Sequence, residues 1–418
     1  MRALVRSGAG IAVAMAVMNV ATYGFTIFSA HVLGPREYGG VASLMGLLLV
    51  VNVLALGLQA TGARQVAAEP ERRDEIESTI MSATYRSALF LGVVSLAFTP
   101  LISWGLGLDS WEAAAMIGAS AVPLTVMGGQ AGILQGEGRW LQLAAVYLGM
   151  GLGRMAFGAV LMPAIGNAFG AMLAVAVSAW VPALIGAVAL GRIRPRPGAW
   201  AGGSRILHEV LGNSSALLAF FALSNLDVVI ARGRFDEHDA GLYAGGLILT
   251  KAVLFLPQFV VVIAFPSMAS ASGKHRMYLR GLAAVGAIGA AATLGAVVLS
   301  SLAVTFIGGS AYRDVGPDIW VFATLGTLLA LIQLMVYEVV ARQHRASALI
   351  VWAGLVAVAV GGMLVDQGHQ LVRVVALVDL GVLVALVLTA TFHPALRSRE
   401  DHQDLDGAPL PVPPLPTT

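Results

Sequence analysis

Long apolar runs, separated by short polar segments, repeat along almost the whole chain. A helix needs about 20 largely apolar residues to cross the roughly 30 Å hydrocarbon layer of a membrane. By this criterion the pattern predicts twelve membrane-spanning helices, six on each side of an arginine-rich break near the midpoint. The predicted spans are approximately 8–33, 40–64, 85–107, 112–135, 140–163, 167–191, 207–232, 239–268, 278–307, 316–341, 345–366 and 370–393.

Composition supports lipid as the solvent for most of this surface. Hydrophobic residues make up 58% of the 418 positions and charged residues only 11%, against about 25% charged in ordinary soluble domains. The predicted fold class is therefore an all-α polytopic membrane protein. The chain contains no cysteine, which excludes disulfides, thiolate metal sites and cysteine nucleophiles.

The distribution of lysine and arginine predicts the orientation of the spans. With the N-terminus in the cytoplasm, eighteen basic residues fall in or next to cytoplasmic loops and five fall on the outer side. This asymmetry follows the positive-inside rule. It predicts a multi-pass protein of the bacterial inner membrane with both termini in the cytoplasm.

The central break divides the chain into two predicted bundles of six helices. We expect an N-terminal bundle at 1–191, a cytoplasmic linker at 192–206, a C-terminal bundle at 207–395 and a disordered, proline-rich cytoplasmic tail at 396–418. The turn after the first span, Leu33-Gly-Pro-Arg-Glu-Tyr-Gly-Gly, has a weak counterpart after the seventh. Aligning Gly39 with Gly241 predicts parallel repeats about an axis along the membrane normal.

The same turns carry a resemblance to a known family. Ala30-His-Val-Leu-Gly-Pro-Arg-Glu-Tyr-Gly-Gly, together with Asn225-Leu-Asp-Val-Val-Ile-Ala-Arg and the following Ala240-Gly-Leu-Tyr-Ala, is similar to segments of the bacterial polysaccharide (lipid-linked oligosaccharide) flippases. These flippases belong to the multidrug/oligosaccharidyl-lipid/polysaccharide exporter superfamily. The resemblance implies two six-helix bundles around a central cavity that opens alternately to each side of the membrane.

Several kinds of chemistry are not indicated by the sequence. No phosphate-binding Gly-x-x-x-x-Gly-Lys-Ser/Thr motif and no His-Glu-x-x-His or similar metal-ligand cluster occurs. The net charge of +2 is too small to indicate a nucleic-acid partner. We therefore expect no enzymatic activity, cofactor, metal or nucleotide, and transport driven by a gradient, a membrane potential or a partner.

Two basic residues within predicted spans are candidates for binding an anionic substrate. A charge at mid-membrane costs at least about 2.5–3.5 kcal/mol when it faces lipid. We therefore expect Arg154 and Lys251 to face the protein interior or a cavity. Arg154 either binds a substrate phosphate or bonds to carbonyls of a neighbouring helix, with Gly149 and Gly153 permitting close packing. Gln258 follows Lys251 by seven residues on the same helical face and completes the predicted substrate-binding set.

Four further charged residues are candidates for coupling or gating. Asp227 could pair with Arg232 or Lys251, or carry a coupling proton, and Asp379 is a second carboxylate within a span. Arg64 and Glu338 lie near predicted inner helix ends, where snorkelling and gate salt bridges are the competing explanations.

The leading hypothesis is a secondary-active flippase for a polyprenyl-diphosphate-linked oligosaccharide. It would contact membrane lipids and polysaccharide-assembly membrane proteins. A cation-coupled multidrug exporter is an alternative, although spans 1–6 contain no mid-membrane acid for its cavity. A non-transporting scaffold of a glycan assembly complex is a second alternative, and a major-facilitator-type porter matches poorly.

Overall fold

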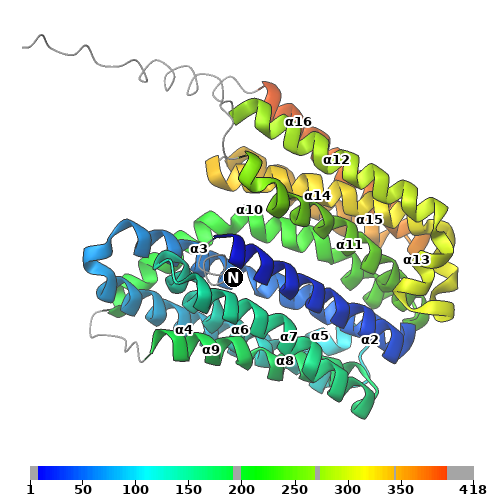
Figure 1. Cartoon of the computed structure of the whole chain (residues 1–418). Helices are drawn as coiled ribbons and strands as arrows, with labels where there is room; N and C mark the ends of the chain where they lie inside the picture. The colour runs from blue at the N-terminus through cyan, green and yellow to red at the C-terminus, as the bar shows by residue number, and fades with distance from the viewer. Residues whose placement is uncertain (1–7, 192–198, 269–273, 343–344, 393–418) are drawn as a thin grey trace, which may run out of the picture.

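The computed structural model describes the backbone of residues 8–191, 199–268, 274–342 and 345–392. Side chains are described within these ranges except at 8–9, 199–214, 256–268, 274–280, 337–342, 345–347 and 390–392. In the described part of the chain every regular element is an α-helix or a short 3₁₀ helix (Figure 1). The all-α prediction is confirmed.

The helices before the central break form the first group. They are α2 (Gly8–Val51), α3 (Val53–Ala68), the 3₁₀ helix η1 (Pro70–Arg72), α4 (Arg73–Ala97), α5 (Thr99–Gly105), α6 (Trp111–Gly136), α7 (Trp140–Ile165), α8 (Ala168–Ser178) and α9 (Trp180–Leu190).

The helices after the break form the second group. They are α10 (Ala199–Arg234), α11 (Glu237–Met268), α12 (Lys274–Val298), α13 (Ser300–Ile307), the 3₁₀ helix η2 (Gly309–Asp318), α14 (Ile319–Arg342), α15 (Arg345–Met363) and α16 (Gly368–Phe392).

The first helix reverses direction at Gly34. Its φ of 71° lies in the left-handed region that glycine adopts without steric cost, and Pro35 follows with the fixed φ of a first helical residue. The continuous assignment Gly8–Val51 therefore contains all of the first span and the start of the second. The second span continues through α3 after an interruption at Asn52.

The twelve predicted spans match the observed helices to within a few residues at most ends. Besides the second span, three of them consist of two helices in line, α4 with α5, α8 with α9 and α12 with α13. Proline explains the first interruption, because Pro100 stands at the start of α5 and cannot donate a ladder hydrogen bond to the preceding turn. By length and composition alone, nine segments of the described chain are long and apolar enough to cross a membrane, and the first of them, Gly10–Ala68, is long enough for two spans.

Packing separates the helices into two groups that meet along α2, α10 and α11. The largest cluster of buried apolar residues comes almost entirely from α10–α16, joined only by Ala30 and Tyr38 of α2. Three smaller clusters draw their buried residues from α2–α9. The exact boundaries predicted for the two bundles stay a prediction. Residues 192–198 of the predicted linker and the whole tail lie outside the described residues, and α10 includes the rest of the predicted linker.

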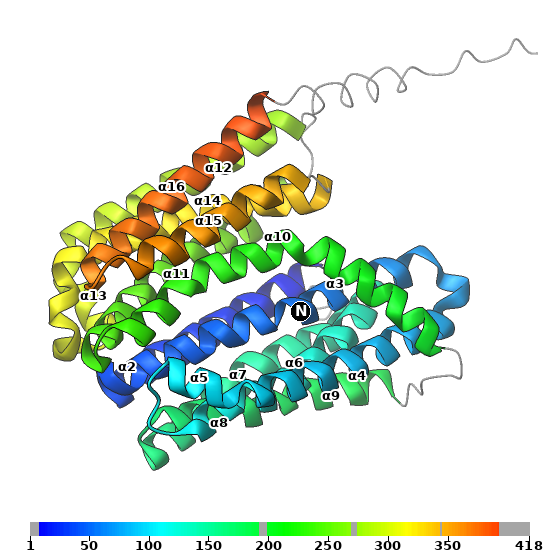
Figure 2. The same ribbon diagram turned by 180° about the vertical axis from the view of Figure 1, so that it is seen from behind.

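The two groups lie close together at one end of the molecule and diverge toward the other (Figures 1 and 2). We call the first the closed end. It contains the turn of α2 at Gly34, the α5–α6 and α7–α8 connections and the α10–α11 turn. At this end the two glycines aligned in the sequence meet, since a Cβ on Gly39 would lie 3.1 Å from the Cα of Gly241. The positive-inside count predicts that the closed end faces outward.

Candidate functional site

A cavity of about 200 Å³ lies between the two groups of helices. Its walls come from α2, α7, α10, α11 and α14, so both groups contribute. Most of its surface is apolar, and its polar groups include Asn19, Tyr23, Asn225 and Gln333 along with two cations, Arg154 and Lys251. The described lining contains no aspartate or glutamate.

Arg154 is the cation that the first group contributes. It lies near the middle of α7 and is 5% exposed. Its Nε has no hydrogen-bond partner, and the structure records no ion pair for it among the described residues. The arrangement therefore contains a buried guanidinium whose charge no described group of the protein offsets.

Two glycines on the same face of α7 allow Arg154 to reach the cavity. Gly151 and Gly158 are spaced three and four residues from Arg154, so all three share the face that packs on α2. A Cβ on Gly151 would lie 2.6 Å from the Cα of Met18, and one on Gly158 would lie 2.7 Å from the ring of Phe25. Close approach of α7 and α2 therefore depends on these two positions having no side chain.

Lys251 is the cation of the second group, and α10 holds it. Its Nζ donates to the carbonyl oxygen of Ser224 at 2.7 Å and to Oδ1 of Asn225 at 3.0 Å. Two residues along α10, Asp227 is 2% exposed and accepts hydrogen bonds from the Tyr243 hydroxyl at 2.9 Å and the Val228 amide at 2.8 Å. The groups of α10 that bind the Lys251 ammonium and the Asp227 carboxylate thus lie within one turn of the same helix.

Asp379 of α16 is a second buried carboxylate beside this group. It is fully buried, and neither of its oxygens has a hydrogen-bond partner among the residues that the structure describes. It lies close enough to Asp227 and Lys251 for their charges to interact. Of the two partners expected for Asp227, the structure therefore places Lys251 nearby, whereas Arg232 contacts the closed-end loops instead.

The chain matches the model of one protein family over residues 29–317, and the description of that family is polysaccharide biosynthesis protein. The match covers more than half of the chain. The chain belongs to this family. No curated protein matches the chain at a significant level.

Solved structures similar to this polysaccharide biosynthesis family member are transporters of the MOP superfamily. The inward-facing conformation of a multidrug resistance MATE family transporter matches with a TM-score of 0.72 and 13% identity, covering 96% of this chain and all of that one. Its outward-facing counterpart gives 0.64 and 17% identity, with 96% of each chain covered. A MOP superfamily transporter from Pyrococcus furiosus, with a binding pocket described as having reverse polarity, gives 0.63 and 16%, again with 96% of each chain covered.

These likenesses show the fold, which is that of the MOP superfamily transporters. The predicted fold, an all-α polytopic membrane protein, and the predicted link to polysaccharide biosynthesis are confirmed. The chain is a multi-pass membrane protein of a transporter fold, and its family links it to polysaccharide synthesis.

The remaining predicted site residues of this family member lie elsewhere or cannot be placed. Arg64 lies on the exposed side of α3 and does not line the cavity. The side chains of Gln258 and Glu338 lie outside the described residues. Sequence reasoning did not assign Tyr23 and Tyr38 to the cavity, because aromatic residues are common in apolar spans and only the packing of α2 on α11 turns these two inward.

Proposed function

We propose that this protein is a secondary-active flippase that moves a lipid-linked oligosaccharide or polysaccharide precursor across the bacterial inner membrane by alternating access. The observation that carries the proposal is Arg154, a buried cation on the wall of a cavity between two helix groups, for which the described residues supply no counter-ion. A polyprenyl diphosphate headgroup supplies the missing negative charge. Its lipid tail would remain in the bilayer while the headgroup occupies the cavity.

Charge distribution supports an anionic substrate over a cationic drug. Arg154 and Lys251 are the charged residues of the described lining, and no carboxylate balances them there. In a site of low effective dielectric, two like charges repel a cationic ligand by several kcal/mol at short range. Asn19, Tyr23 and Gln333 add hydrogen-bonding groups of the kind that sugar hydroxyls use.

The coupling step is proposed for the second group of helices. Asp379 has no hydrogen-bond partner in the described part of the chain and neighbours Asp227, so two carboxylates lie in one buried region. Such a pair is costly to keep fully charged, and binding a proton or another monovalent cation relieves that cost. Asp227 and Asp379 would therefore bind the driving ion, while Arg64 and Glu338 are proposed to act near the inner gate and Gln258 near the substrate.

The membrane setting follows from the loop charges. The proposed location is the bacterial inner membrane, with both termini and the 192–206 linker in the cytoplasm. The protein would act without chemistry of its own, beside membrane proteins that make and assemble the glycan.

Transport in proteoliposomes tests the proposal. A fluorescent disaccharide on a polyprenyl diphosphate is placed in both leaflets, and an impermeant reagent reports how fast the inner-leaflet copies reach the outside. We expect flipping by the wild-type chain, at least tenfold slower flipping by Arg154→Gln, and no change in the exposed control Arg373→Gln. Equal rates for wild type and Arg154→Gln would refute the cavity assignment, and no flipping by any chain would favour the scaffold alternative.

A further inference from the structure

Arg232 joins the two helix groups at the closed end. It lies in the last turn of α10, and its side chain is only 5% exposed. Its Nε donates to the Leu106 carbonyl at 3.1 Å, and its two terminal nitrogens donate to the carbonyls of Arg36 at 3.2 Å and Gly107 at 3.3 Å. One terminal nitrogen also meets Oε1 of Glu237 at 3.4 Å. Three acceptors from the first group therefore bind one side chain of the second.

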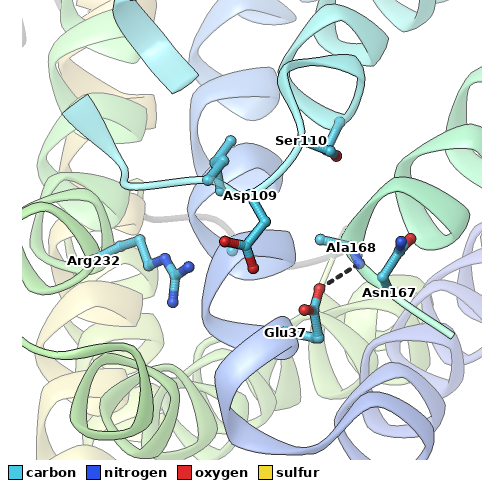
Figure 3. A pocket seen from close by; sticks show the side chains of 9 residues that line it. Glu37, Asp109, Ser110, Asn167, Ala168 and Arg232 are labelled. Carbon is cyan, nitrogen blue, oxygen red and sulfur yellow. Dashed lines mark hydrogen bonds between the residues drawn. The ribbon is translucent and has the colours of Figure 1, made fainter. Parts of the chain in front are cut away.

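The acceptors belong to two separate segments of the first group. Leu106 and Gly107 lie in the α5–α6 connection, and Arg36 lies just after the reversal of α2 at Gly34. Figure 3 shows the Arg232 guanidinium reaching toward the loop that carries Asp109, on the rim of a pocket of about 130 Å³. One guanidinium thus ties both segments to the end of α10.

Glu37 fixes the far side of the same pocket. Its carboxylate accepts a hydrogen bond from the Ala168 amide at the start of α8, at 2.7 Å (Figure 3). An acceptor at this position satisfies one of the amides that a helix start leaves without a partner. The turn of α2 is therefore anchored to α8 within its own group, which makes it a firm base for the contact with Arg232.

We propose that Arg232 is the latch of the closed end: its bonds to these three carbonyls hold α10 against the first group and must break for that end to open. The proposal rests on the alternating access of the proposed function. Arginine suits this role because it presents five donors in a rigid planar fork and never loses its charge. Its hydrogen bonds are charge-assisted and stronger than neutral ones.

Arg232 shares α10 with residues that are proposed to respond to the substrate and to the driving ion. Asp227 lies five residues before Arg232, or about 7.5 Å along α10, and Asn225, which holds Lys251, lies two residues further back. A tilt or rotation of α10 caused by occupancy at these residues would reach the latch directly. Arg232 is thus the contact through which binding at mid-membrane would change the packing of the closed end.

Arg234 provides a matched control. It lies two residues later on α10, and it forms an ion pair with Asp366 at 3.1 Å, in the same helix group. Removing it deletes the same kind of charge from the same helix end but leaves the bonds of Arg232 to the first group in place.

Ser43 provides a reporter of opening. It is fully buried, and its hydroxyl donates to the Val228 carbonyl of α10 at 3.1 Å and to the Gly39 carbonyl at 2.8 Å. Cysteine is close to serine in shape, and the chain contains no other cysteine. A thiol at position 43 can react only when α2 and α10 separate.

The experiment measures the reaction rate of Ser43→Cys with a maleimide in purified full-length protein in lipid nanodiscs. We expect slow labelling in the parent, at least tenfold faster labelling with Arg232→Ala, and the parent rate with Arg234→Ala. Arg232→Lys keeps the charge but has a single nitrogen, so we expect an intermediate rate. If Arg232→Ala does not fold, the Lys variant decides the question alone.

Two outcomes would overturn the latch. They are an unchanged rate in Arg232→Ala or Arg232→Lys, and an equal acceleration in Arg234→Ala. Labelling needs no substrate, so failure of the latch is distinguishable from failure of the flippase proposal. Faster maleimide labelling in Arg232→Ala without any glycan flipping would support the proposed role of Arg232 and refute only the proposed substrate.

Discussion

Replacing Arg154 by glutamine should weaken diphosphate binding without destabilising the empty protein. The guanidinium is 5% exposed and has no recorded partner among the described residues. In the empty state its burial is therefore uncompensated, and taking away the charge removes a destabilising contribution. In the loaded state the same substitution removes a charge-assisted interaction with the ligand.

The expected loss of affinity follows from the strength of such interactions. A hydrogen bond to a charged group contributes about 1.5–3 kcal/mol, and each 1.4 kcal/mol corresponds to a tenfold change in Kd. Arg154→Gln should therefore raise the Kd for a polyprenyl diphosphate by about 10- to 100-fold. Its melting temperature without ligand should equal or exceed that of the wild type.

Thermal unfolding in detergent measures both quantities. Ligand that binds the folded state alone raises the melting temperature with concentration, so geranylgeranyl diphosphate is titrated against geranylgeraniol, which lacks the phosphates. Wild type should be stabilised by the diphosphate only, and Arg373→Gln should behave like wild type. A variant that melts earlier yet keeps its response to the diphosphate would show that Arg154 is structural and would refute the reasoning.

Two further substitutions test the coupling group and the helix contact. Asp379→Asn replaces a fully buried carboxylate that has no hydrogen-bond partner, so we expect equal or higher thermal stability together with flipping that no longer responds to an imposed proton or sodium gradient. Asp366→Asn, on an exposed carboxylate, should leave that response intact, and a persistent gradient response in the Asp379 variant would exclude it from coupling. Gly151→Val should lower stability by about 1–3 kcal/mol through overpacking, because a Cβ there would lie 2.6 Å from the Cα of Met18. Gly281→Ala, where the nearest side-chain atom lies 3.8 Å from an added Cβ, should be neutral by urea or thermal unfolding, and equal stability in both variants would contradict the close packing.

The spans and the reversal at Gly34 could be predicted because their causes are local. Hydrocarbon thickness sets the length of an apolar run, and Gly34-Pro35 combines a residue that tolerates positive φ with one that starts helices. Interruptions such as the one at Asn52 were not predicted, since the residues around it remain apolar on both sides. They depend on how neighbouring helices pack.

The two cavity cations could be identified singly but not as a pair. Their membrane depth alone makes Arg154 and Lys251 unusual. That they line one cavity follows from packing of α7 and α11 on α2, which brings together residues 97 positions apart. The glycine pair at 149 and 153 does pack closely, but against Ile185 and Val181 of α9, while the contact that positions Arg154 involves Gly151.

Arg232 shows the limit of reasoning from span ends. Counted along the sequence, it is one of five basic residues near outer loops, where arginine ordinarily reaches into water. In the structure the α5–α6 connection covers it and supplies two of its acceptors. No local pattern marks a carbonyl as an arginine acceptor, so the burial of this residue depends on tertiary contacts that the sequence does not display.

The proposed roles converge on α10, and this arrangement suggests how they are linked. Asn225 holds the ammonium of Lys251, Asp227 faces Tyr243 and neighbours Asp379, and Arg232 ties the helix end to the first group. An anionic headgroup competes with Asn225 for Lys251, whereas a cation at the carboxylates reduces their attraction for the same ammonium. Both loads therefore weaken the hold of α10 on the same side chain. Since α10 is continuous from Ala199 to Arg234, a shift of α10 at Asn225, where it meets Lys251, would reach the latch without an intermediate hinge.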